Sequence, residues 1–296
     1  MLKHKAYKFR IYPNKAQQIL IAKTIGCSRF AFNRSLNDWN KSYEKTGKGL
    51  SYSACSSELP GLKRQFPWLK EVDSTALQSS IRNLADGYKR FFKGQNEKPR
   101  FKSKKNNVQS YTSKFVNNNI AVIDNRIKLP KLGLVRFASS REVAGRIINA
   151  TIRRNASGKY FISILAESNI EALPKTGASC GIDLGLKDFA TISNGAIYKN
   201  PKCFRTLEEK LAKEQRILSR RKSRSKNWHK QRVKVAKIHE RIANSRRDHL
   251  HKISTDIVKS HDIIGIEDLA PANMLKNHKL AKSALIADTK ILKLKI

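Results

Sequence analysis

The sequence predicts an α+β protein of several domains: a β-barrel with an inserted helical domain, followed by an α/β domain. Three observations predict it. Short alternating strands lie on both sides of a long stretch with helical periodicity, which indicates an insertion. Two apolar strands further along the chain each deliver one acid, Asp183 in SCGID and Glu267 in IGIED. A strongly basic pair of predicted helices separates these two strands.

Composition narrows the class of protein and of partner. The chain has 296 residues, enough for two or three domains, and 40% of them are hydrophobic, which argues against disorder. Its 61 Lys and Arg against 23 Asp and Glu give a net charge of +38, which is typical of a nucleic-acid-binding protein. Because such a charge repels itself in a compact fold, a polyanion is the expected partner. An anionic membrane surface is the rival partner for such a charge. No apolar run is long enough to span a bilayer and no signal peptide is apparent, and no membrane partner is expected.

The cysteine pattern favours neither a zinc site nor disulfides. Four cysteines are widely scattered, at 27, 55, 180 and 203, and no pair has C-x-x-C spacing. This pattern indicates reduced thiols in a cytoplasmic protein and no bound zinc.

The N-terminal residues predict a strand and a long helix. Lys5–Tyr12 alternates apolar with basic residues and is stopped by Pro13. Asn14 is expected to cap the following helix, with Gln17 as its capping-box partner. Apolar residues then recur at helical spacing until Gly47, which is expected to end the helix.

Further helices are expected to complete a helical domain over residues 14–94. Ser51–Leu59 predicts a short helix closed by Pro60. Asp73 or Ser74 is expected to cap another helix. Aromatic residues at helical spacing are interpreted as core and not as a platform for base stacking: Phe32, Trp39 and Tyr88.

A basic segment marks the return to β structure. Its candidate nucleic-acid contacts are Lys98, Arg100, Lys102, Lys104 and Lys105. Strand candidates then follow over Val108–Phe115, Asn119–Ile123, Arg126–Leu129, Leu134–Phe137, Ile147–Arg154 and Tyr160–Ala166. The first strand needs partners and is expected to pair with these, so that residues 1–13 and 95–170 form the barrel.

After a linker at 171–178, the chain is expected to place a basic helical hairpin between the two acidic strands. The hairpin spans 203–260, and from Arg205 to Ser260 there are 18 Lys or Arg and 6 Asp or Glu. A solvated surface is the usual explanation of a charge run, but this imbalance favours phosphate contact. The densest run supplies the candidate contacts Arg220, Arg221, Lys222, Arg224 and Lys226.

The two acids are the candidate catalytic residues. An acid in an apolar strand is costly unless it is paired or holds a metal. Taken singly, Asp183 could be a turn residue and Glu267 could pair with a lysine. Two strands that deliver acids to one sheet edge can instead build a divalent-metal site, as phosphodiester hydrolysis with Mg²⁺ requires.

These residues resemble a known family. GIDLGLKDFAT at 181–191 resembles the first RuvC motif of the transposon-encoded TnpB (OrfB) proteins, and IGIEDL at 264–269 resembles the second. Three more stretches are similar to family sequence: YKFRIYPNKAQ from Tyr7, PRFKSKKNNVQSYT from Pro99 and KNHKLAKS from Lys276.

The resemblance implies a fold, an activity and partners. TnpB proteins are RNA-guided DNA endonucleases related to type V CRISPR effectors, and are often called transposases. The implied architecture is a wedge-type barrel with an inserted recognition domain, followed by an RNase H-like RuvC domain that would cover 179–283 here. Asp183 matches the first metal-binding carboxylate and Glu267 the second, and each would bind Mg²⁺. The implied partners are a guide RNA from the transposon end and target DNA, in the cytoplasm at the nucleoid.

The chain departs from the family after Glu267. The family continues with a zinc ribbon of two C-x-x-C pairs and a third RuvC motif with another Asp. Residues 268–296 hold no cysteine, and their only acids are Asp268 and Asp288, neither of which matches a motif. The tail at 284–296 is unlike the family.

We therefore expect a C-terminally truncated chain with an incomplete RuvC domain, a weak or incomplete Mg²⁺ site and defective cleavage. The alternative is a nuclease-inactive, guide-RNA-dependent DNA-binding protein or repressor. A general basic RNA-binding protein is a third hypothesis, which the two carboxylate strands argue against.

Overall fold

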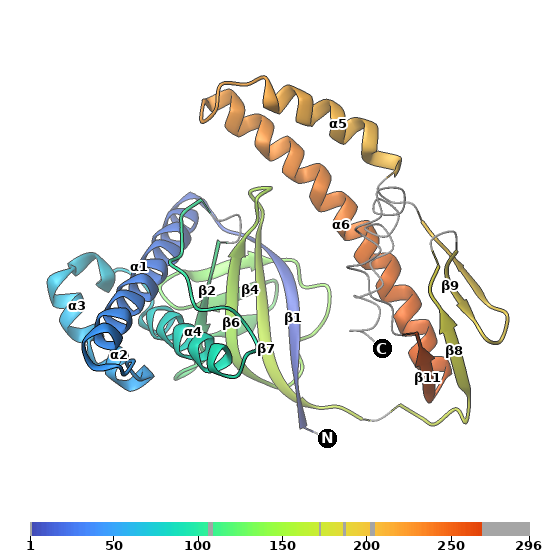
Figure 1. Cartoon of the computed structure of the whole chain (residues 1–296), viewed down its shortest axis with the longest axis horizontal. Helices are drawn as coiled ribbons and strands as arrows, with labels where there is room; N and C mark the ends of the chain where they lie inside the picture. Colours follow the sequence, from blue (N-terminus) through green and yellow to red (C-terminus); the bar gives the residue numbers. More distant parts are fainter. Residues whose placement is uncertain (1, 106–108, 172, 186–187, 202–204, 268–296) are drawn as a thin grey trace. The chain divides into compact units, whose positions relative to one another are not determined.

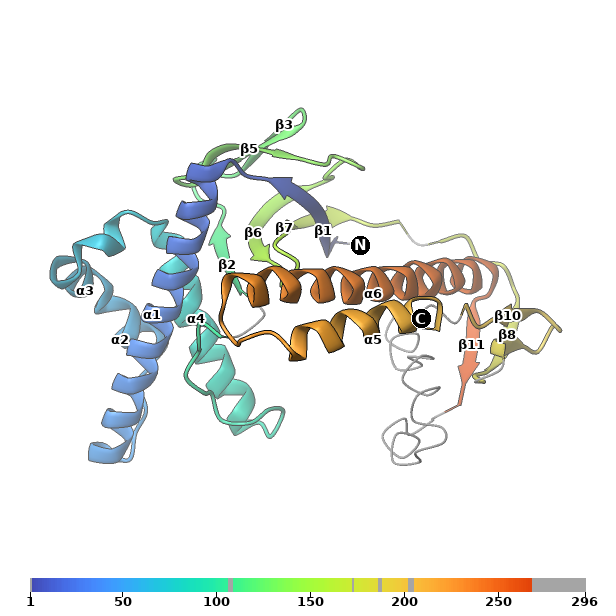
Figure 2. The ribbon, with the colours of Figure 1, turned by 90° about the horizontal axis from the view of Figure 1, so that it is seen from above.

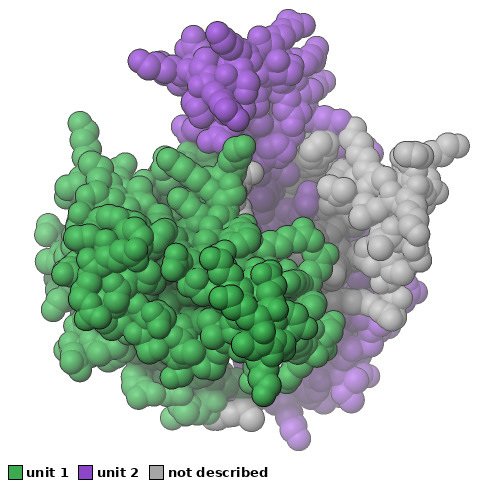
Figure 3. All heavy atoms as spheres, turned by 60° about the vertical axis from the view of Figure 1, so that its left-hand side comes forward, with its two compact units in different colours: residues 1–170 green, residues 171–296 purple. Residues whose placement is uncertain are grey.

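The computed structural model describes residues 2–105, 109–171, 173–185, 188–201 and 205–267 (Figure 1). The chain divides into two compact units, residues 1–170 and 171–296, which Figure 3 colours separately. Some residues named in the sequence analysis lie outside the described ranges: Val108, residues 186–187, Cys203, and residues 268–296, which include Asp268, Asp288 and the tail at 284–296.

Unit 1 contains an antiparallel sheet in the strand order β2-β6-β7-β1-β5-β4-β3. Its strands are β1 (Leu2–Tyr12), β2 (Gln109–Lys114), β3 (Ala121–Ile123), β4 (Arg126–Leu129), β5 (Gly133–Phe137), β6 (Arg146–Arg154) and β7 (Tyr160–Asn169). β1 pairs with β7 along its length and with β5 at its end, so the predicted pairing of the first strand is confirmed. Closure of this sheet into a barrel stays a prediction.

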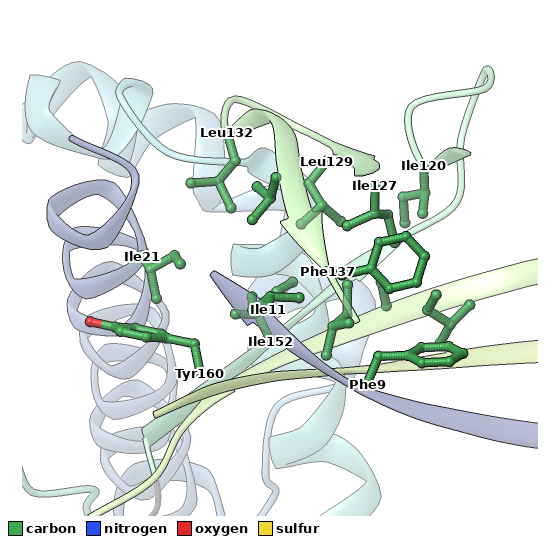
Figure 4. Close-up of a cluster of buried hydrophobic side chains, with 14 of the residues drawn as sticks. Phe9, Ile11, Ile21, Ile120, Ile127, Leu129, Leu132, Phe137, Ile152 and Tyr160 are labelled. Atoms are coloured by element: carbon green, nitrogen blue, oxygen red, sulfur yellow. The ribbon is translucent and has the colours of Figure 1, made fainter. Parts of the chain in front are cut away.

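Alternation along β1 builds the core of the sheet. Tyr7, Phe9 and Ile11 are buried, while the residues between them are exposed. Figure 4 shows Phe9 and Ile11 in the same cluster as Phe137 of β5 and Ile21 of the first helix. Lys8 and Arg10, which lie between the buried residues, are therefore left on the exposed face of the strand.

The helices of unit 1 lie between β1 and β2 in the sequence. They are α1 (Lys15–Thr46), α2 (Tyr52–Ser57), α3 (Leu59–Gln65) and α4 (Ser74–Phe92), with a 3₁₀ turn η1 at Pro67–Lys70. The expected capping box is confirmed: the Gln17 N–H donates to Asn14 Oδ1 at 2.8 Å, and the Asn14 N–H donates to Gln17 Oε1 at 3.0 Å. Gly47 ends α1 in the left-handed region at φ 66°.

The prediction that Pro60 closes a helix is wrong. Pro60 lies in the first turn of α3, which continues to Gln65. A proline is tolerated there because the N–H groups of the first turn have no partner within the helix. Asp73 caps α4, as expected, and also accepts from the Ser113 hydroxyl at 2.6 Å, which ties α4 to β2.

α1 packs against different partners along its length. Near its start, Ile21 and Ile25 join the core of the sheet. Further along, aromatic and aliphatic residues pack with α4: Phe32, Leu36 and Trp39 against Leu84 and Tyr88. The interpretation of Phe32, Trp39 and Tyr88 as core is confirmed, because all three are at most 7% exposed.

Unit 2 contains a mixed sheet in the order β10-β9-β8-β11. Its elements are β8 (Ser179–Asp183), β9 (Asp188–Ile192), β10 (Ile197–Lys199), α5 (Arg205–Ser219), α6 (Lys226–Ser260) and β11 (Ile263–Ile266). The far end of α6 packs on the sheet through Leu250, Ile253 and Ile257. The near end packs against α5 as a hairpin, which Figure 2 shows from above.

Candidate metal and nucleic-acid sites

The two candidate acids lie at one edge of the unit 2 sheet. β8 and β11 pair in parallel, and the last residue pair in register is Ile182 with Ile266. Asp183 and Glu267 directly follow these two residues. Because the carboxyl ends of paired parallel strands meet at the same sheet edge, the structure brings the two acids to neighbouring positions.

Alternation along the strands sets which face the acids occupy. Cys180 and Ile182 of β8 are buried against α6, whereas Asp183 is exposed. Ile264 and Ile266 of β11 also pack on this core, so Glu267 follows on the exposed side. The buried side chains hold the strands, and the two carboxylates are exposed to solvent.

A pair of glycines lies beside the acids. Gly181 of β8 is directly opposite Gly265 of β11 in the ladder. A Cβ on Gly181 would meet nothing nearer than Ser193 Cβ at 4.0 Å, and one on Gly265 nothing nearer than the Cys180 carbonyl oxygen at 3.8 Å. Packing against the described residues therefore does not require glycine at either position, and the pair leaves backbone without side chains next to the carboxylates.

Gly185 has a local structural role. A Cβ there would lie 2.7 Å from the carbonyl oxygen of Asp188, at the start of β9. The close approach of the backbone at this position to Asp188 therefore requires glycine.

Asp262, just before β11, holds the start of the parallel pair in place. The N–H of Thr176 donates to both of its carboxylate oxygens at 3.0 Å, and the N–H of Gly177 donates to Oδ2 at 2.7 Å. The N–H of Asp262 itself donates to the Ala178 carbonyl at 2.8 Å. The hydrogen bonds from Thr176 and then Gly177 lower the pKa of Asp262. Sequence reasoning gave this residue no role; its only signal was an acid directly before an apolar strand.

Replacing Asp262 with alanine should lower the melting temperature of unit 2 at neutral pH. Because the folded pKa lies below the unfolded one, this stabilisation is complete above the unfolded pKa and is lost as the pH falls through the folded pKa. The melting temperatures of wild type and variant should therefore converge below about pH 4. A gap that is the same at acidic and neutral pH would contradict the role assigned to this carboxylate. Asp262→Asn is the control. It keeps a hydrogen-bond acceptor but carries no charge, so any stabilisation that this side chain provides should not depend on pH.

The chemistry of the donor set fits magnesium. Mg²⁺ is bound in proteins through one or two carboxylates and keeps several waters, and two exposed carboxylates meet that requirement. Within the described ranges, no group of three or more His, Cys, Asp or Glu side chains could hold a metal. The cysteines in those ranges, Cys27, Cys55 and Cys180, are buried as free thiols, and burial raises the pKa of each. Cys203 lies outside the described residues.

The basic segment after α4 is exposed and is held to α1 through Asn33. Its five candidate contacts, Lys98, Arg100, Lys102, Lys104 and Lys105, are all exposed. Asn33 of α1 fixes the backbone of Lys102 with two hydrogen bonds, at 2.8 and 3.0 Å. The Lys102 ammonium lies 3.8 Å from the Phe32 ring centroid, and its desolvation there lowers the pKa of Lys102.

The basic run between α5 and α6 is fully exposed. We call Arg220, Arg221, Lys222, Arg224 and Lys226 the basic turn. Ser225 caps α6 through its hydroxyl, and Arg224 has a positive φ of 65°. Within the part of the chain that the structure describes, none of the five forms an ion pair, so their charges are available to an anion.

Comparisons with known proteins bear on both units. A family model described as "Probable transposase" (OrfB_IS605) matches residues 162–278, from β7 onward. A second model, described as "Helix-turn-helix domain" (HTH_OrfB_IS605), matches residues 1–48. In the structure this second stretch is one strand followed by one long helix, β1 and α1.

Relatives match most of the chain. It is 37% identical over 280 residues to "Putative RNA-guided DNA endonuclease InsQ" of Escherichia coli K12, a match that covers 94% of this chain and 69% of InsQ. It is 33% identical over 284 residues to "Putative RNA-guided DNA endonuclease" of Streptomyces pristinaespiralis, covering 94% of this chain and 70% of that protein.

A solved structure also aligns with the chain. This solved structure is a chain of the Cas12f1–sgRNA–target DNA complex. The match has 10% sequence identity and a TM-score of 0.48, and it covers 99% of the present chain and 87% of the Cas12f1 complex chain. None of the helices in the described ranges has the length and apolar character that crossing a bilayer requires. The matches to InsQ and to the Streptomyces protein assign the family: the chain belongs to the transposon-encoded TnpB/OrfB family.

Proposed function

We propose that this chain binds a guide RNA and a DNA target, and that Asp183 and Glu267 hold Mg²⁺ beside the DNA backbone. The single observation that carries this proposal is the parallel pairing of β8 with β11, which brings both acids to one sheet edge. The names of the two relatives, "Putative RNA-guided DNA endonuclease" in both cases, support the same substrate class. A guide RNA encoded at the transposon end and a place at the nucleoid belong to the same proposal.

The residues around the acids suit a phosphodiester. Bound Mg²⁺ would supply an activated water and stabilise the leaving oxygen. Asp183 and Glu267 would hold the ion and fix its position at the sheet edge. The opposed glycines Gly181 and Gly265 leave the neighbouring backbone bare, so a nucleic-acid backbone can come close to the ion.

The number of ligands limits the chemistry. In-line displacement between two metal ions needs more oxygen ligands than two carboxylates supply. We therefore propose that the 296-residue chain binds DNA that matches its guide RNA and does not cut both DNA strands. The alternative of a nuclease-inactive RNA-dependent repressor shares this expectation and would bind without any need for the metal.

Metal binding by the two acids can be measured directly. Asp183→Asn and Glu267→Gln should each weaken Mn²⁺ binding, followed by electron paramagnetic resonance as a substitute for Mg²⁺, by about tenfold or more. Asp124→Asn is the matched control, because Asp124 is an exposed acid in unit 1 with a positive φ that asparagine tolerates. Equal Mn²⁺ affinity in all four proteins would remove the proposed metal site.

A cleavage assay tests the rest of the proposal. The purified chain with its guide RNA should retain a matched DNA duplex in Mg²⁺ without cutting both strands. Efficient cutting that is lost in Asp183→Ala would overturn the proposed defect and make Asp268 or Asp288 the candidate third ligand.

The domain roles are also proposed. We assign residues 1–13 and 95–170 to a wedge-type barrel, 14–94 to a recognition domain, and 179–283 to a RuvC-like domain reached through the linker at 171–178. The pairing of β1 with β7 and the helices between β1 and β2 support the first two assignments.

A further inference from the structure

A stack of aromatic rings runs from the end of α1 to the end of α4. Trp39 and Tyr88 are nearly parallel, with ring centroids 3.7 Å apart and an interplanar angle of 14°. Tyr43 extends the stack from Trp39 at 5.4 Å and 10°, and Phe92 extends it from Tyr88 at 6.2 Å and 26°. Four rings from two helices therefore form one aromatic series, in which Phe92 is the most tilted, at 39° to Trp39 with ring centroids 6.5 Å apart.

The middle of this series is held rigidly. The Trp39 indole lies so close to the backbone of Gly49 that a Cβ there would be 2.1 Å from two of its ring atoms. The Tyr88 hydroxyl donates to Asn40 Oδ1 at 3.2 Å, which fixes the second ring. Both rings are buried, so the central pair serves as core.

The ends of the series are open. Phe92 is 67% exposed and Tyr43 is 50% exposed, although aromatic rings of this size are usually buried when they serve only the core. Both line a cavity of about 490 Å³ together with Trp39 and Tyr88. Sites for small organic ligands fall between about 300 and 1,000 Å³. The cavity therefore has flat aromatic walls and room for a ring-shaped ligand.

The surroundings of the cavity are basic. Residues 39–52 and 82–93 hold seven Lys or Arg and two acids, Glu44 and Asp86. Lys89 lines the cavity itself, and Lys45, Lys48 and Lys93 are exposed close to it in sequence. A second copy of the chain would bring an identical basic face against this one and would be repelled. The charge complements an anionic ligand with a flat ring, which describes a nucleotide.

We propose that this cavity binds an unpaired nucleotide of the RNA, whose base stacks on the open aromatic ends and whose phosphate meets Lys89. The proposal rests on the proposed function for the identity of the partner. RNA is favoured over DNA because proteins recognise RNA mostly through bases splayed out of loops and bulges onto aromatic rings. The bases of a DNA duplex are paired and stacked, and reach a pocket only after the duplex has opened.

Substitutions at the open ends test the proposal without removing the core pair. Tyr43→Ala and Phe92→Ala should each weaken binding of a short oligoadenylate RNA by about 5- to 150-fold, the usual effect of removing one base-stacking ring. Phe92→Tyr keeps the ring and should keep the affinity. Phe91→Ala is the matched control, since Phe91 is the adjacent aromatic residue on α4, also exposed, and does not line the cavity.

A second measurement reports position. Ultraviolet crosslinking of the same oligonucleotide with 8-azidoadenine, followed by mass spectrometry, should attach the label to peptides that contain Tyr43 or Phe92. Crosslinks confined to other peptides, or unchanged affinity in both alanine variants, would overturn the proposal while leaving RNA binding intact.

Other outcomes would change the assigned ligand. If the alanine variants lose as much affinity for the oligodeoxyadenylate of the same length as for the RNA, the assignment to RNA is overturned. A dimer dissolved by Phe92→Ala with unchanged RNA affinity would assign the cavity to a second copy. If wild type binds no RNA even at low salt, the proposed function itself fails.

Discussion

Replacing all five residues of the basic turn with glutamine is expected to weaken RNA binding by about a hundredfold or more at low salt. The reason is that each phosphate that is no longer neutralised keeps its counterion. For wild type, with six or more phosphates neutralised, affinity should fall by about 10³-fold or more between 50 and 200 mM salt. In the variant, the slope of log affinity against log salt should be shallower by about 0.7 for each phosphate that the turn had neutralised. Filter binding across a salt series measures both quantities.

A charge-conserving variant separates charge from side-chain identity. Arg220→Lys, Arg221→Lys and Arg224→Lys in one protein keep the net charge of the turn, so slope and affinity should stay near those of wild type. A glutamine variant with the slope of wild type would show that these exposed side chains face solvent only. In that case the net positive charge of the hairpin would lie on a surface that contacts only solvent.

Truncating Leu250 to alanine is expected to destabilise unit 2 by about 2–5 kcal/mol, the usual cost of removing a buried leucine side chain. Leu250 is 1% exposed and packs α6 on the sheet with Ile253 and Ile257. Since this face of α6 supports β8 and β11, hydrogen exchange should rise in both strands. Binding of Mn²⁺ at the proposed metal site should weaken together with them.

The same experiment contains its own controls. Peptides from unit 1 should exchange as in wild type, because the two units have separate cores. Arg247→Ala, at an exposed position on the same helix, should change stability by no more than about 0.5 kcal/mol. Equal destabilisation of both units by Leu250→Ala would mean that they fold as one cooperative block.

Local chemistry explains which elements the sequence predicted well. The capping box of Asn14 and Gln17 and the left-handed end at Gly47 involve residues a few positions apart, so their pattern is visible in the sequence. The strand over Arg126–Leu129 was predicted with its observed bounds for the same reason. The prediction for Pro60 was wrong because proline occurs both after the ends of helices and in their first turn. Only the residues that follow the proline distinguish these two positions.

The site was predicted in part. The acidic strands indicated that Asp183 and Glu267 share an edge, and the parallel ladder places them there. The register could not be predicted from the sequence, because it depends on how α6 packs on the sheet. The opposition of Gly181 and Gly265 therefore could not be predicted either. The hydrogen bonds of Asp262 to the linker and of Asn33 to Lys102 join residues far apart in sequence, which no local pattern reports.

The parallel pairing of β8 with β11 also has a consequence for the order of folding. β9, β10, α5 and α6 lie between these strands in the sequence, so the two acids come together only after a long loop closes. Contacts within the α5–α6 hairpin are more local and are expected to form first, and parallel pairs with distant partners to form late. During synthesis, Asp183 leaves the ribosome well before Glu267. The edge that would hold the metal is thus expected to be among the last parts of unit 2 to be assembled, after the helical hairpin that carries the basic turn.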